Sequence, residues 1–267
     1  MIDTVLINAS AIAAFVPASL QVLRRLPSRD ALFWGVVGLA AAAAFARAGW
    51  QLAGAWETSL AAALWLTVAA TLAIYAVTAA VAPQAWRLAP VVCGYMILLG
   101  GIASVWQQTP GQPLDSGAAT TGWTAVHIVL SVVTYGIVTV AAIAALAAFL
   151  QERALKQKQP TALTRMLPPI ASCETLVVRL LLIGEVLLAL GLATGMAVQY
   201  HETGALLVFD HKTILTITAF LVVAGLLAAH YISGVRGRRA ARLVLLAYLL
   251  LTLGYPGLKF VTDVLIG

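Results

Sequence analysis

Charged side chains are scarce in this sequence: only 10% of its 267 residues are Asp, Glu, Lys or Arg. Soluble domains carry about 25% charged residues, so the composition excludes a soluble globular protein. The chain instead has 62% hydrophobic residues and a mean hydropathy of +0.97. Its apolar runs are continuous rather than alternating, which favours membrane-spanning helices over a β-barrel.

Cysteine is almost absent as well. The two cysteines, Cys93 and Cys173, belong to no Cys-x-x-Cys or Cys-x-x-Cys-His motif. A disulfide framework, a thiol-redox motif and covalent attachment of haem are therefore unsupported. The N-terminus also lacks a basic stretch before its first apolar run, so we expect that run to be a retained span rather than a cleaved signal peptide.

Eight apolar runs predict an all-α integral membrane protein, a bundle of eight transmembrane helices. No segment between the runs is long enough for a soluble domain, so we expect a single transmembrane domain over residues 1–267. The expected spans are Ile2–Val22, Ala31–Ala48, Thr58–Ala82, Leu88–Trp106, Gly122–Leu150, Val178–Tyr200, His211–Ser233 and Ala240–Leu265.

Basic residues are distributed unevenly between the two sides of the expected bundle. The connections after the first, third, fifth and seventh spans hold most of them, so the positive-inside rule predicts that both termini are outside. We expect a multi-pass protein of a bacterial inner membrane with periplasmic termini. The net charge of +6 then reports orientation and does not indicate nucleic acid as a partner. The basic connections contain Arg24, Arg25, Arg29, Arg87, Arg153, Lys156, Lys158, Arg165, Arg236, Arg238, Arg239 and Arg242.

Two of the four histidines open long apolar helices on the predicted outer side. His127 lies about one turn inside its span and His211 is the first residue of another. An ionisable residue inside a membrane helix is a functional-site hypothesis by default. A bare metal ion usually needs three or four protein ligands, whereas two imidazoles from different helices suit the iron of a haem. The alternative is that each histidine caps its helix or binds a backbone carbonyl.

Three cations near the outer ends of different helices are candidate partners for haem propionates: Arg47, Lys212 and Lys259. Charge-assisted hydrogen bonds to carboxylates are strong in such a setting. Trp123, in the same first turns as His127, is a further candidate contact at the outer face. The alternatives are snorkelling of the cations to lipid phosphates and anchoring of the indole at the interface.

Glu185 and His230 are the remaining ionisable residues that we consider for a relay. Glu185 is several residues inside its span and needs a partner if it is ionised, so it favours a proton- or ion-coupled function. His230 lies near the inner end of its span, where packing is the alternative role. We expect His201 in a solvated loop, as an alternative ligand at most.

Several motifs in residues 120–265 have an order and spacing that can be compared with those of known membrane-protein families. They are Trp123-x-x-x-His127-Ile-x-x-Ser131-x-x-x-Tyr135, Glu152-Arg-x-Leu-Lys156, Leu167-Pro-Pro169, Gly191-Leu-x-Thr-Gly195, Asp210-His-Lys212, Gly234-x-Arg-Gly-Arg-Arg239 and Tyr255-x-Gly-x-Lys259. Together they resemble the cytochrome c assembly family of haem-handling membrane proteins (CcsA, CcmC and HemX types), most closely its short YpjD-like and HemX-like members. The first four spans match mainly in layout.

The resemblance implies an eight-span bundle with a non-covalent b-type haem near the outer face. Its axial ligands would be the family's two histidines, His127 and His211 in this sequence. Members of the synthase type carry a Trp-Gly-x-Trp-x-Trp-Asp pattern in an outer loop, which this chain lacks. That absence argues against haem ligation to apocytochrome c and leaves the expectation of haem binding in place.

The expected function is haem handling, trafficking or an accessory role in cytochrome biogenesis, rather than an enzymatic one. Expected partners besides haem and the bilayer are cytochrome c biogenesis proteins, apocytochrome or quinone. Two other classes remain open. A bis-histidine b-type haem could carry electrons from quinol, and Glu185 could serve a secondary transporter.

Overall fold

The computed structural model describes residues 2–24, 27–52, 59–107, 122–204 and 210–261. These residues form helices and no strands, and eight of the helices are long and apolar enough to cross a membrane, as predicted. The predicted span ends at Thr58 and Leu265 lie outside the described residues. The eight are α1 (Ile2–Ser19), α2 (Ala31–Leu52), α3 (Leu60–Val81), α4 (Ala89–Val105), α5 (Gly122–Gln157), α7 (Ile170–Thr203), α8 (His211–Ser233) and α9 (Gly237–Thr252).

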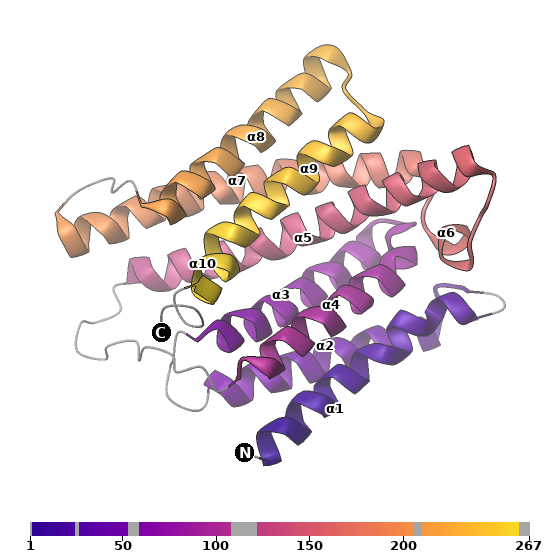
Figure 1. The fold of residues 1–267 in the computed structure, drawn as a ribbon, viewed down its shortest axis with the longest axis horizontal. Coiled ribbons are helices and arrows are strands. Elements are labelled where there is room, and N and C mark those ends of the chain that lie inside the picture. Colours follow the sequence, from indigo (N-terminus) through magenta and orange to yellow (C-terminus); the bar gives the residue numbers. More distant parts are fainter. Residues whose placement is uncertain (1, 25–26, 53–58, 108–121, 205–209, 262–267) are drawn as a thin grey trace.

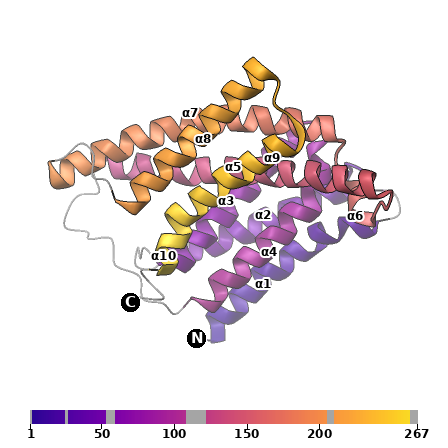
Figure 2. The ribbon, with the colours of Figure 1, turned by 45° about the horizontal axis from the view of Figure 1, so that its top comes forward.

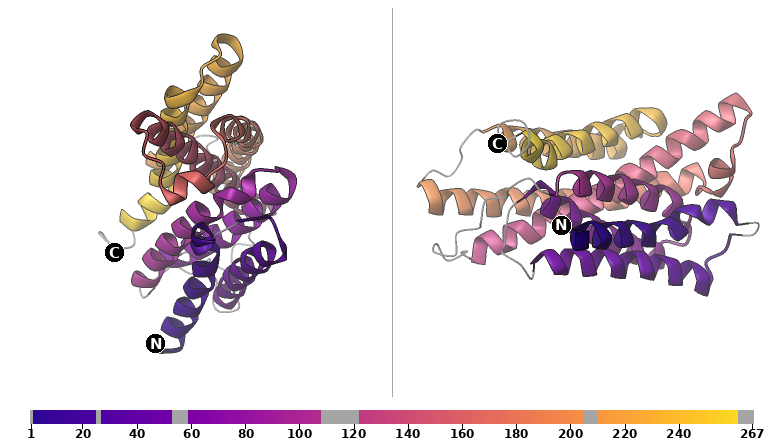
Figure 3. Two further views of the ribbon diagram at one scale, coloured as in Figure 1. Left: turned by 90° about the vertical axis from the view of Figure 1, so that its right-hand side faces the viewer. Right: turned by 60° about the horizontal axis from the view of Figure 1, so that its bottom comes forward.

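The helices form two groups that follow the chain. Helices α1 to α4 pack together on one side, and α5, α7, α8 and α9 lie on the other (Figures 1 and 3). Helices α5 and α7 form the most extensive helix–helix contact, and α3 packs on α5 to join the two groups. Phe15, Phe33, Trp65 and Tyr75 are fully buried, so the first group supplies the largest buried side chains.

Local sequence explains where these helices begin and end. Ser59 and Asp210 are the N-caps of α3 and α8, and their side chains accept hydrogen bonds from the backbone N–H groups of Ala62 and Thr213. Such caps satisfy a donor that the helix itself leaves free. At the other end, α8 stops at Gly234, whose φ of 65° is a left-handed conformation that favours glycine.

The connection between α5 and α7 differs from the prediction. Helix α5 continues past Leu150 to Gln157, and α7 begins at Ile170 rather than Val178. The apolar run marks the part of a helix that suits the bilayer, but polar residues extend the helix where they are themselves good helix formers. The segment between them holds α6 (Ala162–Met166), which a reciprocal capping box of Thr161 and Thr164 begins.

Helix α9 changes geometry at Leu253–Gly257, a π-helical turn named η3, before the short α10 (Leu258–Phe260). Pro256 lies in this turn, and it has no N–H to continue the α-helical pattern. Gly254 and Pro256 are residues typical of a helix kink, and the structure has the π-helical turn at this point. Single π-helical turns occur often at functional sites, and η3 also faces the cavity described next. Helix α9 packs on α5 and crosses it on the way to α10 (Figure 2).

Candidate functional site: a cavity beside His127

A cavity of about 460 Å³ lies near the end of the bundle at which α5 and α8 begin. We call it the His127 cavity. Side chains of α5, α7, α8, α9 and η3 form its walls, together with Thr67 of α3. Its volume falls within the range of about 300–1,000 Å³ that is typical of small-molecule and cofactor sites.

The chemistry of the cavity wall changes with depth. Asp210 and Lys212 line it at the start of α8, and His127 lines it near the start of α5. Tyr135 is eight residues further along α5, which places it about 12 Å deeper at 1.5 Å per residue. Leu251 also lines the deeper part from α9. A ligand with a charged edge and an apolar body would match this arrangement.

His127 is partly buried and points toward α7. Its Nδ1 lies 3.0 Å from the carbonyl oxygen of Gly191 and 3.2 Å from Oγ1 of Thr194. The Gly191–Gly195 pattern has the small-residue spacing that lets neighbouring helices approach, and at Gly195 it gives room to this histidine ring. A Cβ built on Gly195 would lie 3.0 Å from Cε1 of His127.

His211 has a different environment from His127. It is the first residue of α8, is exposed, and is not among the residues that line the cavity. Its neighbours Asp210 and Lys212 both line it, so His211 stands beside the mouth. Burial raises the pKa of Asp210, but hydrogen bonds from Thr213 and the nearby charge of Lys212 outweigh this effect and lower that pKa overall. The carboxylate therefore stays ionised.

The other predicted propionate contacts do not line the cavity. Arg47 is 2% exposed and lies inside the first group of helices. It donates to Asn8, to Gln51 over 2.8 Å and to Gln107 over 2.7 Å, and its guanidinium is 5.2 Å from the ring centre of Trp65. Among the predicted cations Arg47, Lys212 and Lys259, only Lys212 reaches the cavity. Trp123 is 50% exposed and lies outside the lining too.

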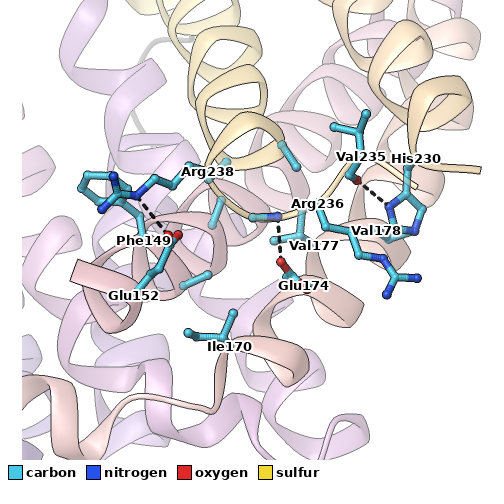
Figure 4. A pocket seen from close by; sticks show the side chains of 15 residues that line it. Phe149, Glu152, Ile170, Glu174, Val177, Val178, His230, Val235, Arg236 and Arg238 are labelled. Carbon is cyan, nitrogen blue, oxygen red and sulfur yellow. Dashed lines mark hydrogen bonds and ion pairs between the residues drawn. The ribbon is translucent and has the colours of Figure 1, made fainter. Parts of the chain in front are cut away.

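The candidate relay residues lie apart from the His127 cavity. His230 is at the opposite end of the bundle, where its Nδ1 is 3.1 Å from the carbonyl oxygen of Val235 (Figure 4). The residues that line a small cavity of about 40 Å³ there include an ion pair of Glu152 with Arg238 at 3.1 Å and a hydrogen bond to Glu174 from the Gly237 N–H.

Glu185 sits on α7 with both carboxyl oxygens buried, and neither has a hydrogen-bond partner within the described part of the chain. His201 was expected in a loop, but it lies in the last turn of α7 and is exposed there. Over the described residues, no three His, Cys, Asp or Glu side chains are grouped as ligands for a bare metal ion.

A chain of hydroxyl groups begins at the cavity wall and was not foreseen from the sequence. The Tyr135 hydroxyl is 2.9 Å from Oγ1 of Thr252 and 3.3 Å from the hydroxyl of Tyr248, which in turn is 2.5 Å from that of Tyr95. Tyr95 belongs to α4, so the chain links the two groups of helices. Tyr135 stood in a motif, but no pattern marked Tyr95 or Tyr248.

Comparison with known proteins agrees with the family resemblance of the motifs. A family model described as "Cytochrome C assembly protein" matches residues 31–266. The chain belongs to this family. It is 50% identical, over the full length of both chains, to an uncharacterised 28.8 kDa protein of Azospirillum brasilense encoded in a nifR3-like 5′ region.

A second relative is the inner membrane protein YpjD of Escherichia coli strain K12. It is 32% identical over 182 residues, which are 68% of this chain and 66% of that protein. No solved structure matches the chain. The protein is thus a multi-pass membrane protein of the cytochrome c assembly family with a polar-mouthed cavity beside His127.

Proposed function

We propose that this protein holds one non-covalent b-type haem in the His127 cavity and serves haem handling, trafficking or an accessory step in cytochrome biogenesis. Family membership supports the class of function. The inner membrane is the proposed location, with both termini periplasmic, because the relative YpjD is named an inner membrane protein and the basic connections favour that orientation.

The observation that carries the proposal is the state of the His127 ring. Its Nδ1 faces a backbone carbonyl of α7, and the residue lines the cavity. Histidines that bind metals commonly donate their other ring N–H to a carbonyl or carboxylate. The ring is therefore arranged as a ligand would be, with Nε2 left to bind iron.

Two further features of the cavity fit a haem. Lys212, beside the Asp210 carboxylate at the start of α8, supplies a cation at the mouth that would hold a propionate by a charge-assisted hydrogen bond. Leu188 and Leu251 supply apolar wall deeper in the membrane, where the body of the macrocycle would be excluded from water. When bound, the haem would supply an iron centre for ligand binding and one-electron chemistry.

His211 is the proposed second axial ligand. Because its ring is exposed beside the mouth rather than in the lining, bis-histidine ligation requires this ring to turn inward, whereas His127 already lines the cavity. Arg47, Lys259 and Trp123 lie outside the lining, so we assign the propionate contact to Lys212 among the predicted set.

The test of this proposal is the haem content of the protein purified in mild detergent. We expect a pyridine haemochrome spectrum of b type, and we expect acid-acetone to extract all the haem because no Cys-x-x-Cys-His motif can bind it covalently. Haem that stays with the protein after extraction would contradict non-covalent binding. A colourless protein that also fails to take up added haemin would reject the proposal as a whole.

Electron transfer from quinol is the second candidate, and the hydroxyl chain from Tyr135 to Tyr95 favours it. Hydrogen-bonded hydroxyls beside a redox cofactor can accept or return the proton that accompanies an electron. A soluble quinol should then reduce the bound haem, more slowly in the Tyr248→Phe variant. Failure of quinol to reduce a haem that dithionite reduces would exclude this function and leave haem handling.

A further inference from the structure

The contact of His127 with α7 determines which ring nitrogen carries the proton. A carbonyl oxygen only accepts hydrogen bonds, so the 3.0 Å contact of Nδ1 with the Gly191 carbonyl requires a hydrogen on Nδ1. In a neutral imidazole, Nε2 then keeps its lone pair. The tautomer follows from the backbone of α7 and not from any ligand.

Thr194 strengthens this arrangement. It is 8% exposed, and its Oγ1 lies 3.0 Å from the carbonyl oxygens of both Leu190 and Gly191. The hydroxyl hydrogen is therefore directed to the α7 backbone, and a lone pair of Oγ1 remains to accept from Nδ1 of His127 over 3.2 Å. Both acceptors around Nδ1 favour the same tautomer.

Gly195 provides the space in which the ring lies. A Cβ at this position would be 3.0 Å from Cε1 and 3.4 Å from Nδ1 of His127, closer than side chains normally approach. Gly191, one turn earlier on the same helix, has nothing within 4 Å of such a Cβ. The two glycines of the Gly-x-x-x-Gly pattern thus differ: a Cβ at Gly195 would displace the ring by a few tenths of an ångström, whereas a Cβ at Gly191 would meet nothing.

We propose that Thr194 and Gly195 are positioning residues for His127, which hold its ring with Nδ1 protonated and set Nε2 as the atom that binds a ligand. The identity of that ligand as haem iron rests on the proposed function, but the tautomer and orientation of the ring do not. Loss of such outer hydrogen bonds typically weakens metal binding by about 10–100-fold.

The first experiment uses the full-length protein without haem, labelled with ¹⁵N-histidine and reconstituted in lipid. The His127 signals are assigned by their loss in His127→Ala, and the tautomer is read at alkaline pH from the two ring nitrogens. We expect Nδ1–H in the wild type and a raised share of Nε2–H in Thr194→Val and Gly195→Ala. Thr194→Ser keeps the hydroxyl and Gly191→Ala keeps the backbone carbonyl, so both should show the wild-type tautomer.

The outcomes of this experiment are decisive in both directions. An Nε2–H tautomer in the wild type would overturn the proposal, and so would wild-type signals in both Thr194→Val and Gly195→Ala. Valine keeps the size of threonine but lacks the hydroxyl, whereas serine keeps the hydroxyl but lacks the methyl group. The Thr194→Ser variant therefore separates the hydrogen bond from the packing.

The second experiment adds haemin to the same variants and follows its transfer to apomyoglobin. Thr194→Val and Gly195→Ala should lose haemin about 10–100-fold faster than wild type, with a changed absorption spectrum, while Thr194→Ser should not. Equal rates in all of these variants, with fast loss in His127→Ala, would reject the positioning role and retain the ligand. If His127→Ala itself keeps haemin as the wild type does, the proposed ligation fails, and the tautomer measurement alone then decides the positioning of the ring.

Discussion

Replacing Arg47 by Ala should destabilise the first group of helices without removing any contact of the His127 cavity. Arg47 donates one hydrogen bond each to the side-chain oxygens of Asn8, Gln51 and Gln107. Asn8 also donates to the oxygen of Gln107 over 3.2 Å. In the Ala variant the Gln107 oxygen therefore keeps a hydrogen-bond donor, whereas the side-chain oxygens of Asn8 and Gln51 lose the donor that Arg47 supplied.

The expected loss of stability follows from those two oxygens. A buried acceptor without a partner costs about 1–3 kcal/mol, so two would cost about 2–6 kcal/mol. Gln51 is only half-buried and keeps some access to solvent or headgroups. We therefore expect the free energy of unfolding to fall by about 2–4 kcal/mol. Loss of the cation–π contact with Trp65 acts in the same direction.

Unfolding in mixed micelles of mild detergent and SDS, followed by tryptophan fluorescence, measures this change. Lys212→Ala is the matched control, because Lys212 is exposed and lines the cavity. That variant should unfold as the wild type does but lose haem faster. The reasoning is refuted if Arg47→Ala keeps the wild-type free energy of unfolding, or if it loses haem as Lys212→Ala does while remaining equally stable.

Three further predictions concern other parts of the chain. A fusion after residue 267 should be active with alkaline phosphatase and dark with green fluorescent protein, and the reverse would invert the predicted orientation. Glu185→Gln should leave the free energy of unfolding unchanged, because buried carboxyl oxygens without a described partner favour a neutral side chain; a loss above about 1 kcal/mol would indicate an ionised one. Hydrogen bonds from Arg24 hold the pKa of Asp30 well below its ordinary 3.8, so this pair stabilises the fold above that pH and loses its effect as the pH falls through the lowered pKa. The thermal midpoint of Asp30→Asn should accordingly lie below that of the wild type at neutral pH and approach it in acid, and an unchanged difference in acid would contradict the ion pair.

The sequence was sufficient for the spans because each depends on a local property, a continuous apolar run long enough for the bilayer. An irregular turn at Pro256 was predictable for the same reason, since a missing N–H acts within one turn. The end of α5 was not predictable from the apolar run. The helix continues after that run stops, and Glu152 and Lys156 stabilise the continuation through an ion pair at 2.6 Å.

The candidate site could be predicted only in part. His127 was identifiable because an ionisable residue inside an apolar helix is rare. The burial of Arg47 was not predictable, since its partners Asn8, in α1, and Gln107, in the turn after α4, are distant in sequence, and no pattern in a single sequence pairs them. Likewise Thr194 resembles many helix threonines that bond their own backbone, and only the packing of α5 on α7 brings it to His127. Whether His211 binds iron stays a prediction.

The measurement that tests the central claim most directly is the absorption spectrum of the haem-loaded protein and of its single histidine variants. We expect His127→Ala to lose the haem or to change its spectrum from low-spin to high-spin, because the Nε2 ligand is removed. His201→Ala and His230→Ala are the controls and should keep the wild-type spectrum, since His201 is exposed at the end of α7 and His230 bonds Val235 at the opposite end of the bundle. A wild-type spectrum in His127→Ala would contradict the account.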